Sequence, residues 1–239
     1  MGDAKQKHPP ASFDCIWSIT KPISRTLMAL IESLPLFPLG LVLYPHERLP
    51  LHIFEERYKD LSRYCLENDA PFGIVFADDG ELATVGCTAR IQEVVNQYED
   101  GRVDIIVEGE ERFHLGQLYD RESYITADVE LLDDETADVA VALKERVITQ
   151  HMKLLELAGR TVRPTLYENV SQLSFVLAQN AGLDTSQKQK VLELDGEAER
   201  IEYLIEHFES LIPRVEQRED VRRRIRSNGH FKDFPPESV

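Results

Sequence analysis

The stretch LPLFPLGLVLYPHERLPLHIFEERYKDL, residues 34–61, decides the fold of this chain. Its first half is apolar and is divided by four prolines: Pro35, Pro38, Pro45 and Pro50. Because proline has no N–H to donate and a fixed φ, these residues are typical of strand starts, sheet edges and turns. The stretch therefore predicts two short strands of a compact β domain and not a buried parallel sheet.

The pattern changes at Phe54, where apolar residues take up helical spacing. Phe54, Tyr58, Leu61 and Cys65 fall on one face of the expected helix, and acidic and basic residues fill the other face. This pattern predicts a short surface helix that covers the β domain.

Further strands are expected after this helix. The apolar run Phe72–Phe76 ends at an Asp-Asp-Gly turn, which is typical of a strand buried on both sides at the centre of a barrel. Asp100-Gly101 separates two β-rich segments and predicts a hairpin, because glycine supplies the positive φ of a tight turn. The remaining expected strands are residues 86–98, 102–108, 112–118 and 124–132. Six or so short strands with one covering helix predict a small, mixed, partly open barrel.

The second half of the chain has a helical period. One amphipathic helix is expected over residues 139–157 with Gly159 as its stop, and a second over about 169–180. Asp184 is a good N-cap for a third helix over 188–194, and a fourth is expected after Asp195. Pro213 is predicted to kink or end that last helix. Four such helices predict a bundle.

Several segments also resemble a known family, and they occur in that family's order. Residues 34–61 are followed by FGIVF at 72–76, VGCTARI at 85–91, DGRVDIIVEGEERFHL at 100–115 and YITADVELLDD at 124–134. Together they resemble the Lon substrate-binding domain, the amino-terminal domain of the Lon protease, which also occurs as a free-standing protein. KQKVLEL at 188–194 is similar to part of the family's helical lobe.

The resemblance implies an α+β fold, with a PUA-like six-stranded pseudo-barrel followed by a carboxy-terminal helical bundle. We expect a flexible extension at 1–33, the barrel at 34–134, the helical lobe at 135–219 and a basic, polar tail at 220–239.

Net charge limits the classes of partner. A formal charge of −16 over 239 residues repels phosphate groups, which argues against nonspecific binding to nucleic acid or to an anionic membrane. A local exception is a group of arginines: Arg218, Arg222, Arg223, Arg224 and Arg226. We interpret this group as a solvated helix face balanced by neighbouring carboxylates.

Composition also predicts a compartment. Three scattered cysteines are too few for a disulfide framework and fit a reducing cytoplasm. No stretch reaches the roughly 18 to 20 apolar residues that span a bilayer, so a soluble, cytoplasmic protein without membrane contact is expected.

The search for catalytic motifs is negative. The chain has no GxxxxGK[ST] phosphate loop, GxSxG elbow or HExxH pair, and we expect no catalytic residue, cofactor or metal. Full-length Lon joins this domain to an ATPase and a serine-lysine protease domain, neither of which is recognised here. Two enzyme alternatives remain open: Cys87 as a nucleophile, and a metal-dependent hydrolase. The residues of the hydrolase would be His46, Glu47, His52, Glu55 and Glu56.

The resemblance implies a non-catalytic module that recognises unfolded polypeptides or exposed apolar segments, as an adaptor in protein quality control with a separate protease as partner. We expect binding in a groove between barrel and bundle. The candidate residues are Phe37, Leu39, Tyr44, Arg48, Leu49, Phe54 and Tyr58. The alternative for these residues is a place in the core. RNA binding is a second function that the PUA-like barrel leaves open.

Overall fold

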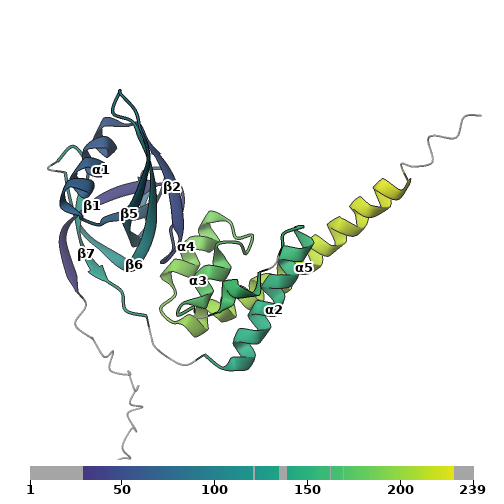
Figure 1. Ribbon diagram of the computed structural model, residues 1–239. Coiled ribbons are helices and arrows are strands. Elements are labelled where there is room, and N and C mark those ends of the chain that lie inside the picture. Colours follow the sequence, from purple (N-terminus) through teal and green to yellow (C-terminus); the bar gives the residue numbers. More distant parts are fainter. Residues whose placement is uncertain (1–28, 121, 135–138, 162, 169, 229–239) are drawn as a thin grey trace, which may run out of the picture.

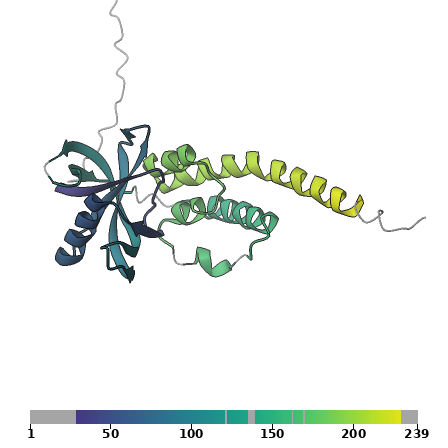
Figure 2. The same cartoon turned by 90° about the horizontal axis from the view of Figure 1, so that it is seen from above.

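A computed structural model describes residues 29–120, 122–134, 139–161, 163–168 and 170–228. A β-barrel and a helical lobe lie side by side, and the last helix projects away from both (Figures 1 and 2). The α+β architecture predicted from the sequence is confirmed. Most of the expected extension at 1–33 lies outside the described residues.

The barrel is built from seven strands and one helix. The strands are β1 (Leu30–Leu39), β2 (Arg48–Ile53), β3 (Phe72–Asp78), β4 (Glu81–Leu82), β5 (Val85–Gln97), β6 (Val103–Tyr119) and β7 (Thr126–Leu131), and α1 (Glu56–Asn68) follows β2. The first strand begins before the expected boundary at residue 33, because Leu30 and Ile31 already pair with Glu130 and Val129 of β7.

Pairing closes the sheet. The order is β1-β7-β6-β5-β3-β4, and β1 also pairs with β3 in parallel, which joins the two sides of the barrel. The second strand pairs with the first half of β6. The other pairings are antiparallel. The third strand lies between β1 and β5, and Phe72 to Val75 are buried, as the sequence predicted.

Seven strands are present where about six were expected, and two of the predicted strands are one. Residues 102–108 and 112–118 both belong to β6, which passes through Gly109. A Cβ at this glycine would lie 2.2 Å from the carbonyl oxygen of Tyr44, so only glycine allows the two backbones to approach here. The two-residue strand β4 was not predicted. The expected hairpin turn is confirmed, with Gly101 at φ 82°.

The helical lobe contains α2 (Val141–Leu157), the 3-10 helix η1 (Pro164–Tyr167), α3 (Leu173–Ala178), α4 (Thr185–Glu193) and α5 (Glu197–Asn228). Asp184 caps α4 through a capping box with Gln187, as its residue type predicted. Helix α3 is shorter than the expected 169–180, because the backbone of Gln172 is not helical (φ −122°, ψ 74°) and the helix begins only after it. No described helix is long and apolar enough to cross a membrane.

Pro213 was predicted to kink or end its helix, and it does not end it. The last helix, α5, runs through Pro213 and beyond the expected lobe boundary at 219. A proline ring removes one backbone donor, and the Arg, Glu and Gln residues that follow are strong helix formers that continue the turn. Residues 229–239 of the expected tail lie outside the described residues.

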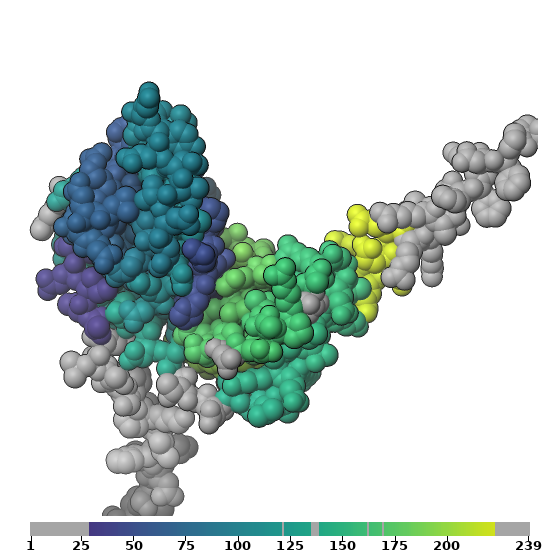
Figure 3. Space-filling model, in the orientation of Figure 1, coloured from purple at the N-terminus to yellow at the C-terminus, as the bar shows by residue number. Residues whose placement is uncertain are grey.

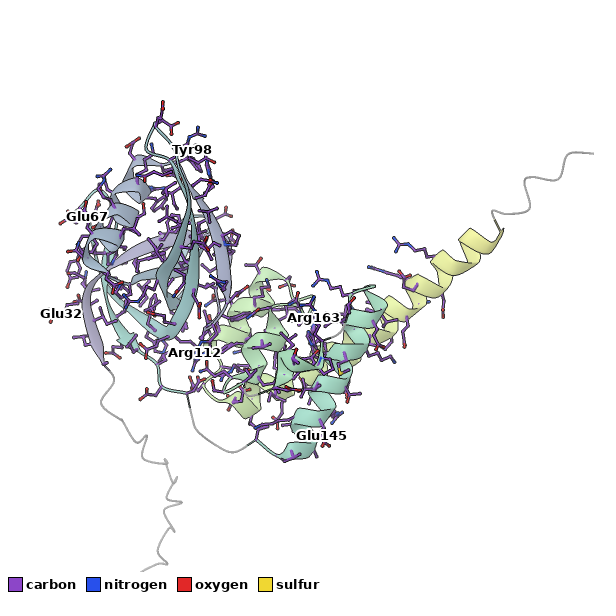
Figure 4. All side chains as sticks on the ribbon, viewed as in Figure 1. Glu32, Glu67, Tyr98, Arg112, Glu145 and Arg163 are labelled. Carbon is purple, nitrogen blue, oxygen red and sulfur yellow. The ribbon has the colours of Figure 1, made fainter. Side chains whose placement is uncertain are left out.

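Two buried arginines join the barrel to the helical lobe. Arg112 of β6 donates to the carbonyl oxygens of Leu192 (2.8 Å) and Leu194 (2.9 Å), and to the Asp134 carboxylate (2.5 Å). It lies where the barrel meets the lobe (Figure 4). Arg200 of α5 is fully buried and pairs with the same Asp134 (2.8 Å) and with Glu197 (3.0 Å).

Aromatic packing completes the junction. Tyr44 from the barrel stacks on Phe175 of α3 with a centroid distance of 5.4 Å, and its hydroxyl donates to the carbonyl oxygen of Lys188 (3.0 Å). The guanidinium of Arg200 lies 4.3 Å from the Phe175 ring centroid. One hydrophobic cluster therefore runs from Val42, Tyr44 and Val85 of the barrel into the helices.

The buried histidine of the lobe is His151. Its Nδ1 lies 2.9 Å from the hydroxyl of Tyr167, and its ring packs near Phe208 at a centroid distance of 5.8 Å. Burial disfavours the charged imidazolium and lowers the pKa of His151 to about 4.

Replacing Arg200 with Met should lower the free energy of unfolding by about 3 kcal/mol or more, because Asp134 and Glu197 lose a buried partner. Urea denaturation measures this change. The matched control is Arg146→Met, which breaks the exposed pair with Glu209 and should change stability by less than about 1 kcal/mol. Equal effects of the two substitutions would contradict a special role for the buried network.

Acid should destabilise the fold through His151. In the unfolded chain the His151 imidazole is protonated below its ordinary pKa of 6.5, but in the folded chain it is protonated only below about 4. Protonation therefore favours the unfolded chain, and the free energy of unfolding, which is highest above pH 6.5, falls as the pH falls from 6.5 to about 4. Between pH 7 and pH 5 the wild type should lose about 2 kcal/mol relative to His151→Gln. Parallel stability curves of the two proteins, measured by urea denaturation across pH, would refute this assignment.

Candidate functional site

A pocket of about 430 Å³ lies where α1 begins, and we refer to it as the α1 pocket. This helix covers the barrel on the side away from the helical lobe (Figures 1 and 2). The pocket is lined by Leu36, Pro38, Arg57, Tyr58, Leu118, Tyr119, Asp120, Ser123, Tyr124 and Ile125. These residues come from β1, the first turn of α1, the end of β6 and the link into β7.

Backbone pairing brings these segments together. The amide N–H of Leu36 donates to the carbonyl oxygen of Ile125 (2.8 Å), which holds the β6–β7 link against β1. The hydroxyl of Tyr119 donates to Asp128 (2.7 Å), which fixes the end of β6 to β7. The β6–β7 link that forms one wall of the pocket is therefore held to the closed sheet at both of its ends.

The pocket surface combines apolar and polar groups, and exposed apolar side chains lie in it and beside it. Leu118 on its rim is 42% exposed, and Tyr64 on the outer face of α1 is 43% exposed. The rings of Tyr64 and Tyr124 lie 6.5 Å apart, centroid to centroid. Burial raises the pKa of two of the three pocket tyrosines, Tyr58 and Tyr124, so their hydroxyl groups stay protonated.

Arg57 is the cation of the α1 pocket. Its guanidinium lies 4.5 Å from the centroid of the Tyr58 ring and pairs with Glu55 at 2.8 Å. The side chain is 51% exposed, so its remaining N–H groups face solvent. Aromatic faces, aliphatic walls and a guanidinium fork can bind an apolar side chain and orient an adjacent carbonyl or carboxylate.

The seven residues predicted to bind peptide do not form one site. Phe37 and Tyr58 meet with ring centroids 4.0 Å apart in the barrel core, and they are 6% and 8% exposed. Leu39 and Leu49 are half-buried against the same core. Of the seven, only Tyr58 lines the α1 pocket.

The other three predicted residues lie elsewhere. Tyr44 is fully buried in the junction with the helical lobe, so this conformation does not present its ring to a ligand. Arg48 is exposed on β2. Phe54 precedes α1, is 60% exposed and lies near His52 with a centroid distance of 6.1 Å. The expected groove between barrel and bundle is therefore not formed by these seven side chains.

Sequence reasoning missed Leu118, Ser123 and Tyr124. Leu118 and Tyr124 were assigned to two strands, and the polar run between them carried no motif. The signal that could have found them is Leu118 on one side and Tyr124 on the other side of a polar link between two strands.

The structure separates the candidate metal ligands. His52 pairs with Asp104 (2.5 Å), Glu55 with Arg57 and Glu56 with Lys59. Glu47 accepts a hydrogen bond from the Tyr44 amide (3.1 Å). Within the described residues, no group of three or more His, Cys, Asp or Glu side chains could hold a metal ion.

The structure also shows the surroundings of the candidate nucleophile Cys87 and of the arginine group near the carboxyl end. Cys87 is fully buried in the barrel, and burial raises the pKa of its thiol, so the reactive thiolate is disfavoured. In the arginine group near the carboxyl end, Arg222 pairs with Glu219 at 3.0 Å along α5. The side chains of Arg223, Arg224 and Arg226 lie outside the described part of the chain.

Comparison with known proteins identifies similar sequences. The family described as "ATP-dependent protease La (LON) substrate-binding domain" matches residues 33–210. The Lon protease of Escherichia coli K12 is 26% identical over 211 residues, which cover 81% of this chain and 27% of that protein. The Lon protease of Azorhizobium caulinodans is 26% identical over 88% of this chain and 26% of its own length. The chain thus spans about a quarter of the length of these curated relatives.

Solved structures show the same fold. The Lon N-terminal domain protein of Xanthomonas campestris superimposes with a TM-score of 0.59 at 27% identity, over 73% of this chain and 98% of that one. The N-terminal domain of the Mycobacterium avium complex Lon protease has a TM-score of 0.54 at 18% identity, over 75% and 100% of the two chains. The second likeness concerns the fold alone.

Burial changes what is expected of two predicted binding residues. Phe37→Ala should lower the free energy of unfolding by about 3 to 5 kcal/mol, because it opens a cavity in the barrel core. Phe54→Ala, at an exposed position, should change it by less than about 0.5 kcal/mol. Chemical denaturation of both variants measures the difference, and a stable Phe37→Ala protein would show that this ring is not part of the core.

Proposed function

This chain belongs to the family of Lon protease (ATP-dependent protease La) substrate-binding domains, and on that premise we propose that it binds unfolded polypeptide at the α1 pocket. The observation that carries this proposal is an open pocket with exposed apolar side chains: Leu118 in its lining, and Tyr64, whose ring lies 6.5 Å from that of the lining residue Tyr124. An exposed apolar patch on a soluble domain is typical of an interaction site.

The chemistry of the pocket favours extended, apolar segments. Ring faces and aliphatic walls accept many side chains without demanding one pattern of hydrogen bonds. Folded proteins bury most of their large apolar side chains, so unfolded segments are the polypeptides that offer them. This selectivity suits a module that distinguishes unfolded from folded chains.

The expected affinity of a single contact is modest. One aromatic side chain buries about 200 Å², which corresponds to about 5 kcal/mol of apolar burial before the ordering of the ligand is subtracted. Weak contacts that are made and released quickly would allow a polypeptide to be passed on. We propose on this basis an adaptor role in protein quality control, in which a separate protease hydrolyses the bound chain.

Recognition without hydrolysis is part of the proposal. The family match concerns a substrate-binding domain, and the 239 residues contain no phosphate-binding loop. The walls of the α1 pocket supply ring faces, three tyrosine hydroxyls, one guanidinium, one serine hydroxyl and one carboxylate, that of Asp120. This set is suited to holding a peptide.

The test is fluorescence anisotropy of a labelled, permanently unfolded protein. Wild type should bind saturably, and Tyr64→Ser combined with Leu118→Ser should bind about tenfold more weakly, a loss of about 1.4 kcal/mol. The matched control is Val141→Ser combined with Leu166→Ser, which removes exposed apolar side chains from the helical lobe.

The control variant should bind like wild type, and all three proteins should melt alike. Equal weakening in both variants would mean that general surface hydrophobicity, and not the α1 pocket, governs binding. Absence of saturable binding by wild type would refute the proposal.

A further inference from the structure

A second pocket lies at the junction of the barrel and the helical lobe. It has a volume of about 540 Å³ and is lined by Phe76, Asp78, Asp79, Glu81, Leu82, Ala83 and Gln189. We refer to it as the junction pocket. Six of its residues come from β3, β4 and their connections, and Gln189 comes from α4. It shares no lining residue with the α1 pocket. Figure 3 shows the surfaces of the barrel and of the helical lobe in contact.

Negative charge is concentrated at the junction pocket. Asp78, Asp79 and Glu81 follow one another around the β3–β4 turn, and in the described part of the chain their carboxylates take part in no side-chain hydrogen bond or ion pair. Elsewhere in the barrel, carboxylates such as Glu110 and Asp104 have side-chain partners, Arg90 and His52. The three carboxylates of the junction pocket are thus free to accept a cation.

Gln189 provides a second, independent indication of a ligand. This side chain is only 8% exposed. Its Nε2 donates to the carbonyl oxygen of Val85 (3.0 Å) and to the Glu193 carboxylate (3.0 Å), which fixes the orientation of the amide. Its Oε1 is buried and accepts no hydrogen bond from the described residues. A buried acceptor without a donor is unfavourable, so a donor from a ligand would stabilise this arrangement.

The remaining walls of the junction pocket are apolar. Phe76, Leu82 and Ala83 are half-buried and pack on the hydrophobic clusters of the two parts of the molecule. A ligand that fits must therefore combine an apolar stem with a hydrogen-bond donor and a positive charge. The side chains of Lys and Arg have this composition.

We propose that the junction pocket binds an Arg or Lys side chain of a polypeptide segment. The methylene stem lies against Phe76 and Leu82, the head group pairs with the carboxylates, and an N–H donates to Gln189 Oε1. Arg fits better than Lys, because its guanidinium carries five donors in a plane and pairs with carboxylates in a bidentate manner.

This inference extends the proposed function and rests on the idea that the chain binds polypeptide. It adds a charge preference to recognition: the α1 pocket takes an apolar side chain, and the junction pocket takes a basic one. Acidic segments would be disfavoured by the net charge of −16 and by the three free carboxylates.

The test uses two labelled peptides that differ at one position. Both are apolar and extended, and one carries a central Arg where the other carries Gln. In fluorescence anisotropy, wild type should bind the Arg peptide about tenfold more tightly than the Gln peptide at low salt, and the difference should shrink at high salt.

The decisive variant is Asp79→Asn combined with Glu81→Gln. Asn tolerates the left-handed backbone of residue 79, which has φ 46°. This protein should bind both peptides with the affinity that wild type has for the Gln peptide. The matched control is Glu67→Gln combined with Glu145→Gln, which removes the same charge from α1 and α2 (Figure 4). Neither helix lines the junction pocket. The control should keep the preference for Arg.

The outcomes separate this inference from the proposed function. Equal binding of the two peptides by wild type, or an equal loss of preference in the control variant, overturns the junction site while apolar binding stands. Binding of the Arg peptide alone, abolished by Asp79→Asn with Glu81→Gln, supports the junction site and overturns the apolar one. Binding of neither peptide overturns both.

Discussion

The arrangement of this molecule depends on one shared carboxylate. Asp134 lies between two buried guanidinium groups, those of Arg112 from the barrel and Arg200 from the helical lobe. Each arginine also donates to the carbonyl oxygen of Leu194, just after α4. Because a buried charge is tolerated only when its partners are in place, this network favours the observed placement of the lobe against the barrel. The placement in turn positions Gln189 beside the β3–β4 turn and so creates the junction pocket.

The two pockets differ because of the elements that build them. The α1 pocket is formed within the barrel, where the β6–β7 link leaves apolar side chains uncovered beside the first turn of α1. The junction pocket needs both parts of the molecule, since its acidic turn comes from the barrel and Gln189 from α4. A module with one apolar and one acidic pocket can select segments by hydrophobicity and charge together, which a single apolar patch does not achieve.

Patterns local in sequence predicted the elements well. The period of two in the Val103–Val107 region, the Asp100-Gly101 turn and the Asp184 cap all correspond to features of the structure. Local rules failed where tertiary contacts compete with them. Gly109 continues β6 because Tyr44 lies against it, and Pro213 does not end α5 because good helix formers follow it. The burial of Phe37 and Tyr44 could not be inferred from an apolar stripe, which is the same for a core and for a binding surface.

The sequence by itself determined the family, the α+β class, the approximate elements and the acidic character of the surface, because these follow from residue types, their spacing and their order. Only the tertiary structure decided which apolar residues are accessible and which polar groups lack a partner. Tyr64 and Tyr124, whose rings meet, are separated by 60 positions in the sequence, and Asp79 and Gln189, which line one pocket, by 110. Their proximity follows from the closure of the barrel and from the buried arginine network, which act between residues that no local pattern connects.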